Sequence, residues 1–154
     1  MSGPWTPEPF EADDGTMPFE RFMEKLSDFK FVALDMAIDR VLSVRGIDLG
    51  RTEWLKALGE GLFEFRVRHD ADEISRMFGG GPPTVAVPEE KVLLRVFVHF
   101  YGDKVVLLLG GYDKGEDPND RRQQREIMQA RRLLVQFKER RRRQRRSAGP
   151  KGSK

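Results

Sequence analysis

Two segments of the sequence carry arginine at alternating positions, the spacing that puts side chains on one face of a β-strand. The side chains that would share a face are Glu64, Arg66 and Arg68 in the first segment and Arg95, Phe97, His99 and Tyr101 in the second. A guanidinium group stays charged and can donate two parallel hydrogen bonds to a phosphate. We therefore expect Arg66 and Arg95 to meet on the open face of one sheet, where the pair would suit phosphate binding.

Four further residues have side chains suited to proton transfer or charge stabilisation. Lys114 and Tyr112 would flank the two arginines from the end of a third strand, and His69 and His99 titrate near neutral pH. Each candidate also has an ordinary structural explanation. A strand arginine is usually solvated or paired with a carboxylate, Tyr112 can pack, Lys114 can be a surface residue, and either histidine can be structural. The residue types alone leave these alternatives open.

The composition argues against several classes of functional site. The chain has no cysteine and only two histidines, which are far apart in the sequence, so neither a disulfide framework nor a zinc site is predicted. The glycines at 79–81 run into Pro82 and Pro83 rather than into a helix, unlike a phosphate-binding glycine loop. We expect no metal and no cofactor.

The 154 residues suffice for one domain with its own core. No apolar run approaches the length that spans a bilayer, and the N-terminus lacks the basic-then-apolar pattern of a signal peptide. We therefore expect no membrane contact and a cytoplasmic location.

Charge is distributed unevenly along the chain, although the net charge is only +3. Residues 1–18 carry four acidic residues and no basic one, whereas residues 138–154 carry nine basic residues and one acidic residue. We predict an extended or disordered acidic leader at 1–18, a folded domain at 19–138 and a basic disordered tail at 139–154. The leader could be an intramolecular counterweight to the tail, or simply disordered. The tail could contact nucleic acid, or be a solvated helix end.

Apolar spacing near four predicts two helices, at 19–27 and 29–45, packed as a hairpin, and a short helical turn at 52–58. The period then changes to two, which predicts strands at 62–69, 91–101 and 104–112, the last two joined by a tight turn at Gly102-Asp103. Residues 70–90 are predicted to form a loop with a helical turn near 74–78, and a last helix begins near 117–119. The expected fold class is α+β, with an N-terminal helical hairpin, a small antiparallel β-sheet and a C-terminal helix.

Three motifs in this order resemble the RelE/ParE toxin superfamily, specifically its phage-derived, HigB-like branch. The first is LGEGLFEFR at 58–66, and the second is LRVFV at 94–98. The third is LLLGGYDK at 107–114, followed by Pro118 and a helix containing Glu126 and Ala130. The resemblance covers roughly residues 19–138 and implies a RelE-like fold.

Three features differ from the family pattern. Many relatives carry two lysines after the aromatic residue, whereas here Asp113 precedes a single Lys114. The segment at 70–90 is longer than usual. The N-terminal strand that many relatives add to the sheet is expected to be absent, or broken by Pro4, Pro7 and Pro9.

The resemblance implies the toxin of a type II toxin–antitoxin system, a metal-independent endoribonuclease that cleaves mRNA on the ribosome and so inhibits translation. It implies catalytic roles for Arg66, Arg95, Lys114 and Tyr112, with the two arginines holding the scissile phosphate. RNA contacts would come from Arg68, His99, Arg140, Arg141, Arg142 and Arg143. The implied partner is a helix-turn-helix antitoxin. The helices containing Phe22, Phe29 and Phe31 could be its docking surface or part of the core.

Two other functions remain compatible with the sequence. A ParE-like inhibitor of DNA gyrase shares the scaffold and performs no catalysis, so the fold cannot separate it from the nuclease. A non-catalytic nucleic-acid-binding phage or prophage protein is the second alternative.

Overall fold

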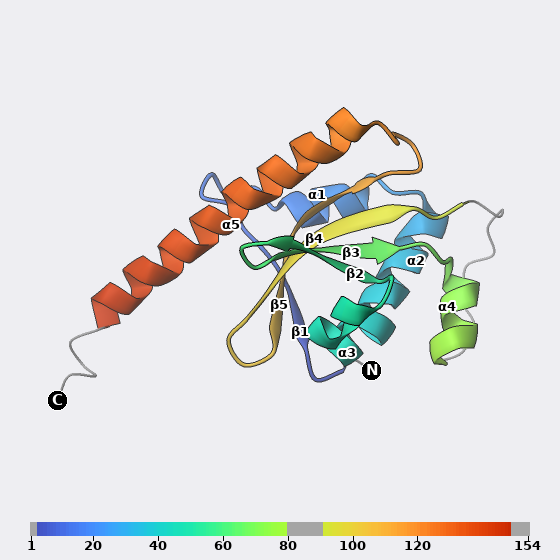
Figure 1. Cartoon of the computed structure of the whole chain (residues 1–154), viewed down its shortest axis with the longest axis horizontal. Helices are drawn as coiled ribbons and strands as arrows, with labels where there is room; N and C mark the ends of the chain where they lie inside the picture. Colours follow the sequence, from blue (N-terminus) through green and yellow to red (C-terminus); the bar gives the residue numbers. More distant parts are fainter. Residues whose placement is uncertain (1–2, 80–90, 149–154) are drawn as a thin grey trace.

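The computed structural model describes residues 3–79 and 91–148 as a five-stranded sheet with helices on both faces (Figure 1). The strands are β1 (Thr6–Pro9), β2 (Leu55–Gly59), β3 (Leu62–Val67), β4 (Leu94–Tyr101) and β5 (Val105–Asp113). Their order is β1-β5-β4-β3-β2, with β1 parallel to β5 and the other pairs antiparallel. The prediction of a mixed helix-and-sheet fold with a C-terminal helix is confirmed, whereas the predicted antiparallel sheet is antiparallel only in part, because β1 runs parallel to β5.

The N-terminal half is mainly helical. It contains α1 (Pro18–Glu24), α2 (Asp28–Ala37), the π-helix η1 (Ile38–Leu42), α3 (Ser43–Arg45) and the 3-10 helix η2 (Gly46–Arg51). The run from α2 to α3 corresponds to the predicted helix at 29–45 and ends at Gly46, whose φ of +50° favours glycine. Further on, α4 (Ala71–Phe78) begins with a capping box between Asp70 and Glu73. The predicted helical turn near 74–78 is therefore part of a longer helix.

The sheet separates two apolar cores because strand side chains alternate between its faces. Phe65, Val96 and Leu108 pack on one face against α2, η1 and their neighbours. Phe97 and Leu109 pack on the other face against α5 (Asp120–Ala148), the C-terminal helix. We call these the α2 face and the α5 face.

The N-terminal segment contributes a strand, which corrects the expectation that proline excludes one. The amides of Thr6 and Phe10 donate to the carbonyl oxygens of Lys104 and Leu108, both at 2.9 Å. Backbone N–H groups alternate in direction along a strand, so Pro7 and Pro9 face the outer edge, where no donor is required. Phe10 is buried at 2% exposure, so this segment belongs to the folded domain rather than to a separate leader.

The predicted helical turn at 52–58 is wrong, because residues 55–59 form β2. Leu55 and Ala57 pair with Phe65 and Phe63 of β3, and the tight turn between the strands carries positive φ at Gly59, Glu60 and Gly61. Pairing with β3 thus outweighs the local apolar spacing.

The basic tail is also more ordered than predicted. Residues 139–148, expected to be disordered, continue α5 past the edge of the sheet (Figure 1). Arg131 anchors the middle of this helix over the β2–β3 turn by donating to the carbonyl oxygens of Leu58 and Gly59, at 2.7 and 3.3 Å. The remaining parts of the predicted loop (80–90) and tail (149–154) lie outside the described residues.

Candidate functional site

The two arginines selected from the sequence lie directly opposite each other on neighbouring strands. Arg66 of β3 pairs with Arg95 of β4 in the sheet register, and Arg95 pairs with Tyr112 of β5. Residues that pair directly across strands share a face. We call Glu64, Arg66, Arg95 and Tyr112 the polar row. It lies on the α5 face, so the prediction that Arg66 and Arg95 meet on one face is confirmed.

Glu64 is the centre of the polar row. Its side chain is fully buried, and its Oε1 atom lies 3.0 Å from Arg66 Nε and 3.8 Å from Arg95 Nε. A buried carboxylate is tolerated when cations and hydrogen bonds compensate for its lost hydration. Sequence reasoning placed Glu64 on the correct face but assigned it no role. Its position two residues before Arg66 in an alternating strand was the available signal.

Arg95 is buried, which contradicts the prediction that it binds a phosphate from the open face. Only 4% of its side chain is exposed, compared with 20% for Arg66. Burial lowers the pKa of the Arg95 guanidinium, and the negative charge of Glu64 partly offsets that effect. Arg95 therefore interacts with the Glu64 carboxylate inside the fold and is not placed to contact a polynucleotide. Arg66 is the accessible arginine of the pair.

Tyr112 is buried as well, which contradicts a direct catalytic role in this arrangement. Its ring stacks on Phe97 at a centroid distance of 6.2 Å, and the Arg122 guanidinium lies 5.5 Å from its centroid. Desolvation, together with the nearby charge of Glu64, raises the pKa of Tyr112 to about 12. Glu64 Oε2, Arg95 Nε and the Tyr112 hydroxyl all lack a hydrogen-bond partner among the described residues. Buried polar atoms without partners are uncommon, and three occur in this one row.

Exposed positive charges next to the polar row come from β2 and from the residue that follows β3. Arg68 is exposed just beyond β3, and its charge is close enough to lower the pKa of Arg95. Lys56 of β2 is exposed and pairs with Glu64, so it shares the α5 face. Sequence reasoning missed Lys56 because its segment was predicted to be helical. Lys114 is half-buried in the turn after β5, where its amide donates to the carbonyl oxygen of Leu93 at 2.9 Å.

Asp113, the last residue of β5, has a structural role. Its Oδ2 atom lies 2.7 Å from Lys30 Nζ of α2, and the side chains are 12% and 9% exposed, respectively. The pair joins the end of β5 to α2.

His99 lies apart from the polar row, so the structure does not bring it to Arg66. It is four residues from Arg95 along β4, a separation of about 13 Å in a strand. Its Nδ1 atom lies 2.7 Å from the Gly61 carbonyl oxygen, and its ring centroid lies 5.8 Å from that of Phe137 in α5. Burial lowers the pKa of His99, and α5 restricts its access to RNA.

The arginines at 140–143 are not equivalent. Arg140 donates to Asp13 at 2.8 Å and covers the Phe10 ring at 4.9 Å. Arg141 covers the Tyr101 ring at 4.8 Å. Arg142 pairs with Glu139 within the helix, and Arg143 is exposed. Of the two alternatives for the acidic segment, the structure supports the counterweight to the tail, through the Asp13–Arg140 ion pair. Arg142 and Arg143 are the more accessible cations.

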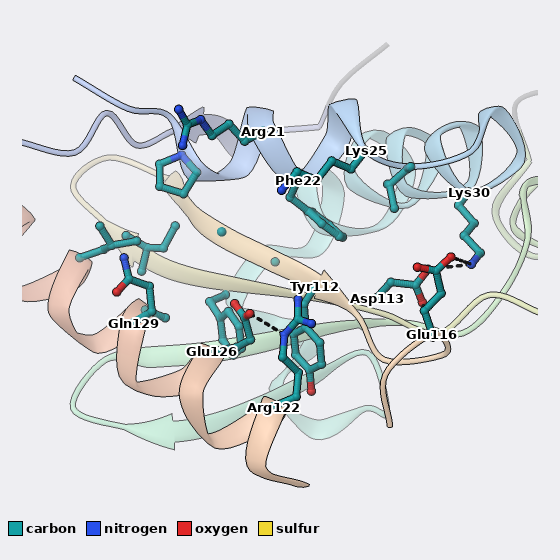
Figure 2. Close-up of a pocket in the computed structure, with 18 of the residues that line it drawn as sticks. Arg21, Phe22, Lys25, Lys30, Tyr112, Asp113, Glu116, Arg122, Glu126 and Gln129 are labelled. Atoms are coloured by element: carbon teal, nitrogen blue, oxygen red, sulfur yellow. Dashed lines mark hydrogen bonds and ion pairs between the residues drawn. The ribbon is translucent and has the colours of Figure 1, made fainter. Parts of the chain in front are cut away.

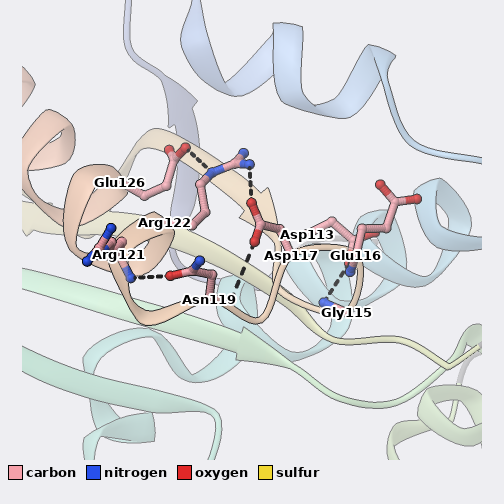
Figure 3. Close-up of polar contacts among 8 residues, drawn as sticks. All are labelled: Asp113, Gly115, Glu116, Asp117, Asn119, Arg121, Arg122 and Glu126. Atoms are coloured by element: carbon pink, nitrogen blue, oxygen red, sulfur yellow. Dashed lines mark hydrogen bonds and ion pairs between the residues drawn. The ribbon is translucent and has the colours of Figure 1, made fainter.

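A pocket of about 360 Å³ opens between α1 and α5, beside the end of β5 (Figure 2). Arg21 and Lys25 are exposed on its α1 wall. On the α5 side, Arg122 donates to Glu126 at 2.7 Å and to Asp117 at 3.2 Å (Figure 3), contacts that raise its pKa. Its charge is therefore partly neutralised, whereas Arg21 and Lys25 form no ion pair within the described ranges.

In residues 3–79 and 91–148, no group of three or more acidic or histidine side chains is arranged to hold a metal ion. Within the same ranges, no helix has both the length and the apolar character needed to cross a membrane. Comparison of the chain with protein-family models, curated proteins and solved structures gives no match.

Proposed function

We propose that this chain binds RNA on the α5 face of its sheet and cleaves it, acting as the toxin of a type II toxin–antitoxin pair. The observation that supports the proposal best is the pairing of Arg66 and Arg95 around the buried carboxylate of Glu64. Arg66 Nε donates to the buried Glu64 carboxylate, so the terminal N–H groups of this guanidinium keep a defined direction. Phosphate recognition requires such fixed donors. The resemblance of the three sequence motifs to the RelE/ParE superfamily points to the same function.

The proposed reaction uses the nucleophile of the substrate itself. The 2′-oxygen of the RNA attacks the adjacent phosphorus, the bond to the 5′-oxygen breaks, and a proton moves from the attacking to the leaving oxygen. Arg66 would neutralise the charge that grows on the phosphate, while Lys56 and Arg68 would hold the flanking backbone. Glu64 and Arg95 would act as positioning residues for Arg66. A helix-turn-helix antitoxin remains the proposed partner.

Single-turnover cleavage of ribosome-bound mRNA tests this proposal. We expect Arg66→Ala to slow cleavage by about 10²–10³-fold, the usual cost of losing one donor to a developing oxyanion. Arg132→Ala is the matched control, because Arg132 is exposed on α5 and bonds only Gln129 among the described residues. Equal activity of the wild-type chain and Arg66→Ala would exclude this site. Mapping transcript 5′ ends after induction in bacteria would show whether cuts fall inside translated codons.

A second function, non-catalytic nucleic-acid binding, is favoured by the burial of Arg95 and Tyr112. Two of the four residues that the resemblance makes catalytic are then out of reach of a polynucleotide. Under this alternative the chain binds RNA in an Arg66-dependent manner but releases it intact, and no transcript ends accumulate after induction.

A further inference from the structure

A groove of about 550 Å³ lies on the α2 face, on the opposite side of the sheet from the polar row. It runs between β1, α1 and the helical segment formed by α2 and η1. Its floor is apolar and is formed mainly by Phe19, Met23, Ile38 and Leu108. Phe31 stands at its border with 41% of its surface exposed, the kind of apolar exposure that marks interaction sites when it adjoins a groove.

Carboxylates occupy both sides of this groove. Glu20 and Glu24 lie one helical turn apart on α1, and Asp35 and Asp39 lie one turn apart across α2 and η1. Partial desolvation and the neighbouring charge of Asp39 raise the pKa of Asp35. Glu20, Glu24 and Asp35 have no ion-pair partner within the part of the chain that the structure describes. The surface therefore combines apolar contact area with negative charge that is unpaired at Glu20, Glu24 and Asp35 among the described residues.

Ser43 gives an independent indication that the groove is a binding site. The residue borders the groove, its side chain is fully buried, and its Oγ atom has no hydrogen-bond partner among the described residues. Its carbonyl oxygen, in contrast, accepts from the Trp5 amide at 2.9 Å. The adjoining wall is the π-helix η1, and π-helical turns occur frequently at functional sites. A buried hydroxyl without a partner is uncommon in proteins, which marks this wall of the groove as unusual.

The edge of the groove limits the conformation of its occupant. Pro7 and Pro9 of β1 line it, and neither has an N–H group to donate. An added β-strand would therefore find few partners, whereas a helix makes its contacts through side chains.

The basic end of α5 in a second copy fits poorly. Its exposed arginines match the negative rim, but residues 138–147 contain no apolar side chain that could fill the floor. We infer that another protein supplies both features.

We propose that this groove binds a basic amphipathic helix of a protein partner. Apolar side chains spaced at i, i+3 or i+4, and i+7 would fill the floor beside Phe31, and lysine or arginine on the flanks would pair with Glu20, Glu24 and Asp35. The inference does not rest on RNA cleavage, because the groove and Arg66 are on opposite faces.

The test uses the full chain and a labelled synthetic helix of about 18 residues, with leucine at the helical spacing above and lysine or arginine on its flanks. Fluorescence anisotropy should show saturable binding that weakens as salt rises. The comparison peptides are a shuffled sequence of the same composition and a version with glutamate in place of every basic residue. Neither comparison peptide should bind as tightly as the basic amphipathic helix.

Variants of the chain locate the binding site. We expect Glu20→Lys/Glu24→Lys to weaken binding about tenfold through lost pairs and repulsion. Phe31→Ser should weaken it at least about fivefold through lost apolar contact. Asp48→Lys/Asp103→Lys, at two exposed positions outside the groove, is a control for charge, and Arg66→Ala should bind the peptide as the wild-type chain does.

Several results would overturn the proposal. Absence of binding, equal binding of the glutamate peptide, or unchanged affinity in the Glu20/Glu24 and Phe31 variants would each do so. Self-association of the chain that disappears in Phe31→Ser would show that a second copy occupies the groove instead. None of these results depends on whether the chain cleaves RNA.

Discussion

At the scale of residues, the buried carboxylate of Glu64 interacts with two arginines. A fully buried carboxylate is costly to desolvate, yet two guanidinium groups approach the same oxygen, Oε1, from neighbouring strands. The arrangement leaves Arg66 partly exposed and holds Arg95 below it. Glu64 therefore links the stability of the sheet to the geometry of the one accessible arginine.

Removing this carboxylate should destabilise the fold strongly. Glu64→Ala leaves Arg95 buried without its counter-ion, and we expect a loss of about 3–5 kcal/mol in the free energy of unfolding, measured with denaturant. Asp72→Ala is the matched control, since Asp72 also pairs with an arginine, Arg76, but both side chains are mostly exposed. Its effect should stay below about 1 kcal/mol. Equal effects of the two substitutions would refute the central role of Glu64.

The Lys30–Asp113 pair makes a second prediction at this scale. Asp113→Lys, which introduces the second lysine of the family pattern, places two positive charges in a mostly buried position. We expect it to lower the free energy of unfolding by about 3–5 kcal/mol in denaturant titrations. The exchanged pair, Lys30→Asp with Asp113→Lys, should recover part of that loss. Failure of the exchange to recover any stability would mean that the pair contributes little by its charges.

At the scale of elements, β1 and the end of α5 hold each other in place. Arg140 reaches from α5 to the segment after β1, where it contacts Asp13, the Glu11 carbonyl oxygen and the Phe10 ring. A short edge strand with two prolines has few hydrogen bonds of its own, so these contacts from the helix are important for its order.

Arg140→Ala should therefore loosen β1 more than the rest of the sheet. We expect faster hydrogen exchange at the amides of Thr6 and Phe10, with a local loss of about 1 kcal/mol from the ion pair and the cation–π contact. Arg143→Ala, at an exposed position of the same helix, should leave exchange unchanged. If both variants exchange alike, the α5 contact does not hold β1.

These two elements also show what local sequence patterns can and cannot predict. The tail was expected to be disordered because its charge density is high, and β1 was excluded because of its prolines. Both depend on contacts with residues more than a hundred positions away, such as Asp13 with Arg140. The segment containing Lys56 failed for a similar reason, because pairing with β3 decides its conformation.

The sequence predicts which face of the sheet the site residues share, but it does not predict how deeply each side chain is buried. Period-two alternation is a property of the strand itself, so the shared face of Arg66 and Arg95 followed from the sequence. Burial depends instead on what covers each side chain. The stacking of Tyr112 on Phe97 and the approach of Arg122 from α5 close over this end of the row, and no local pattern reports either contact.

At the scale of the whole molecule, the sheet keeps two different surfaces apart. The α5 face presents Lys56, Arg66 and Arg68, whereas the α2 face presents the acidic groove. Positive and negative side chains thus gather on opposite faces of the sheet, although the net charge of the chain is only +3. α5 packs on one of these surfaces, and the two tyrosines of the chain report on its contact with the sheet. Tyr112 lies near the start of α5, and Tyr101 lies against Phe137 in its second half.

Alkaline titration should therefore measure how well α5 shields the two tyrosines from solvent. Desolvation raises the pKa of both tyrosines to about 12, helped at Tyr101 by its 2.6 Å hydrogen bond to Glu8. Because the folded state holds these protons more tightly than the unfolded state, stability is retained below about pH 10 and falls as pH rises toward 12. Tyrosinate absorbance after a rapid pH jump should show little ionisation near pH 10, whereas the urea-unfolded chain should titrate there. Tyr112→Phe should halve the tyrosinate absorbance that appears above pH 10 in the folded chain, because one of the two tyrosines is then removed. A transition near pH 10 in the folded wild-type chain would show instead that α5 leaves the tyrosines exposed, and with them the Tyr112 end of the polar row.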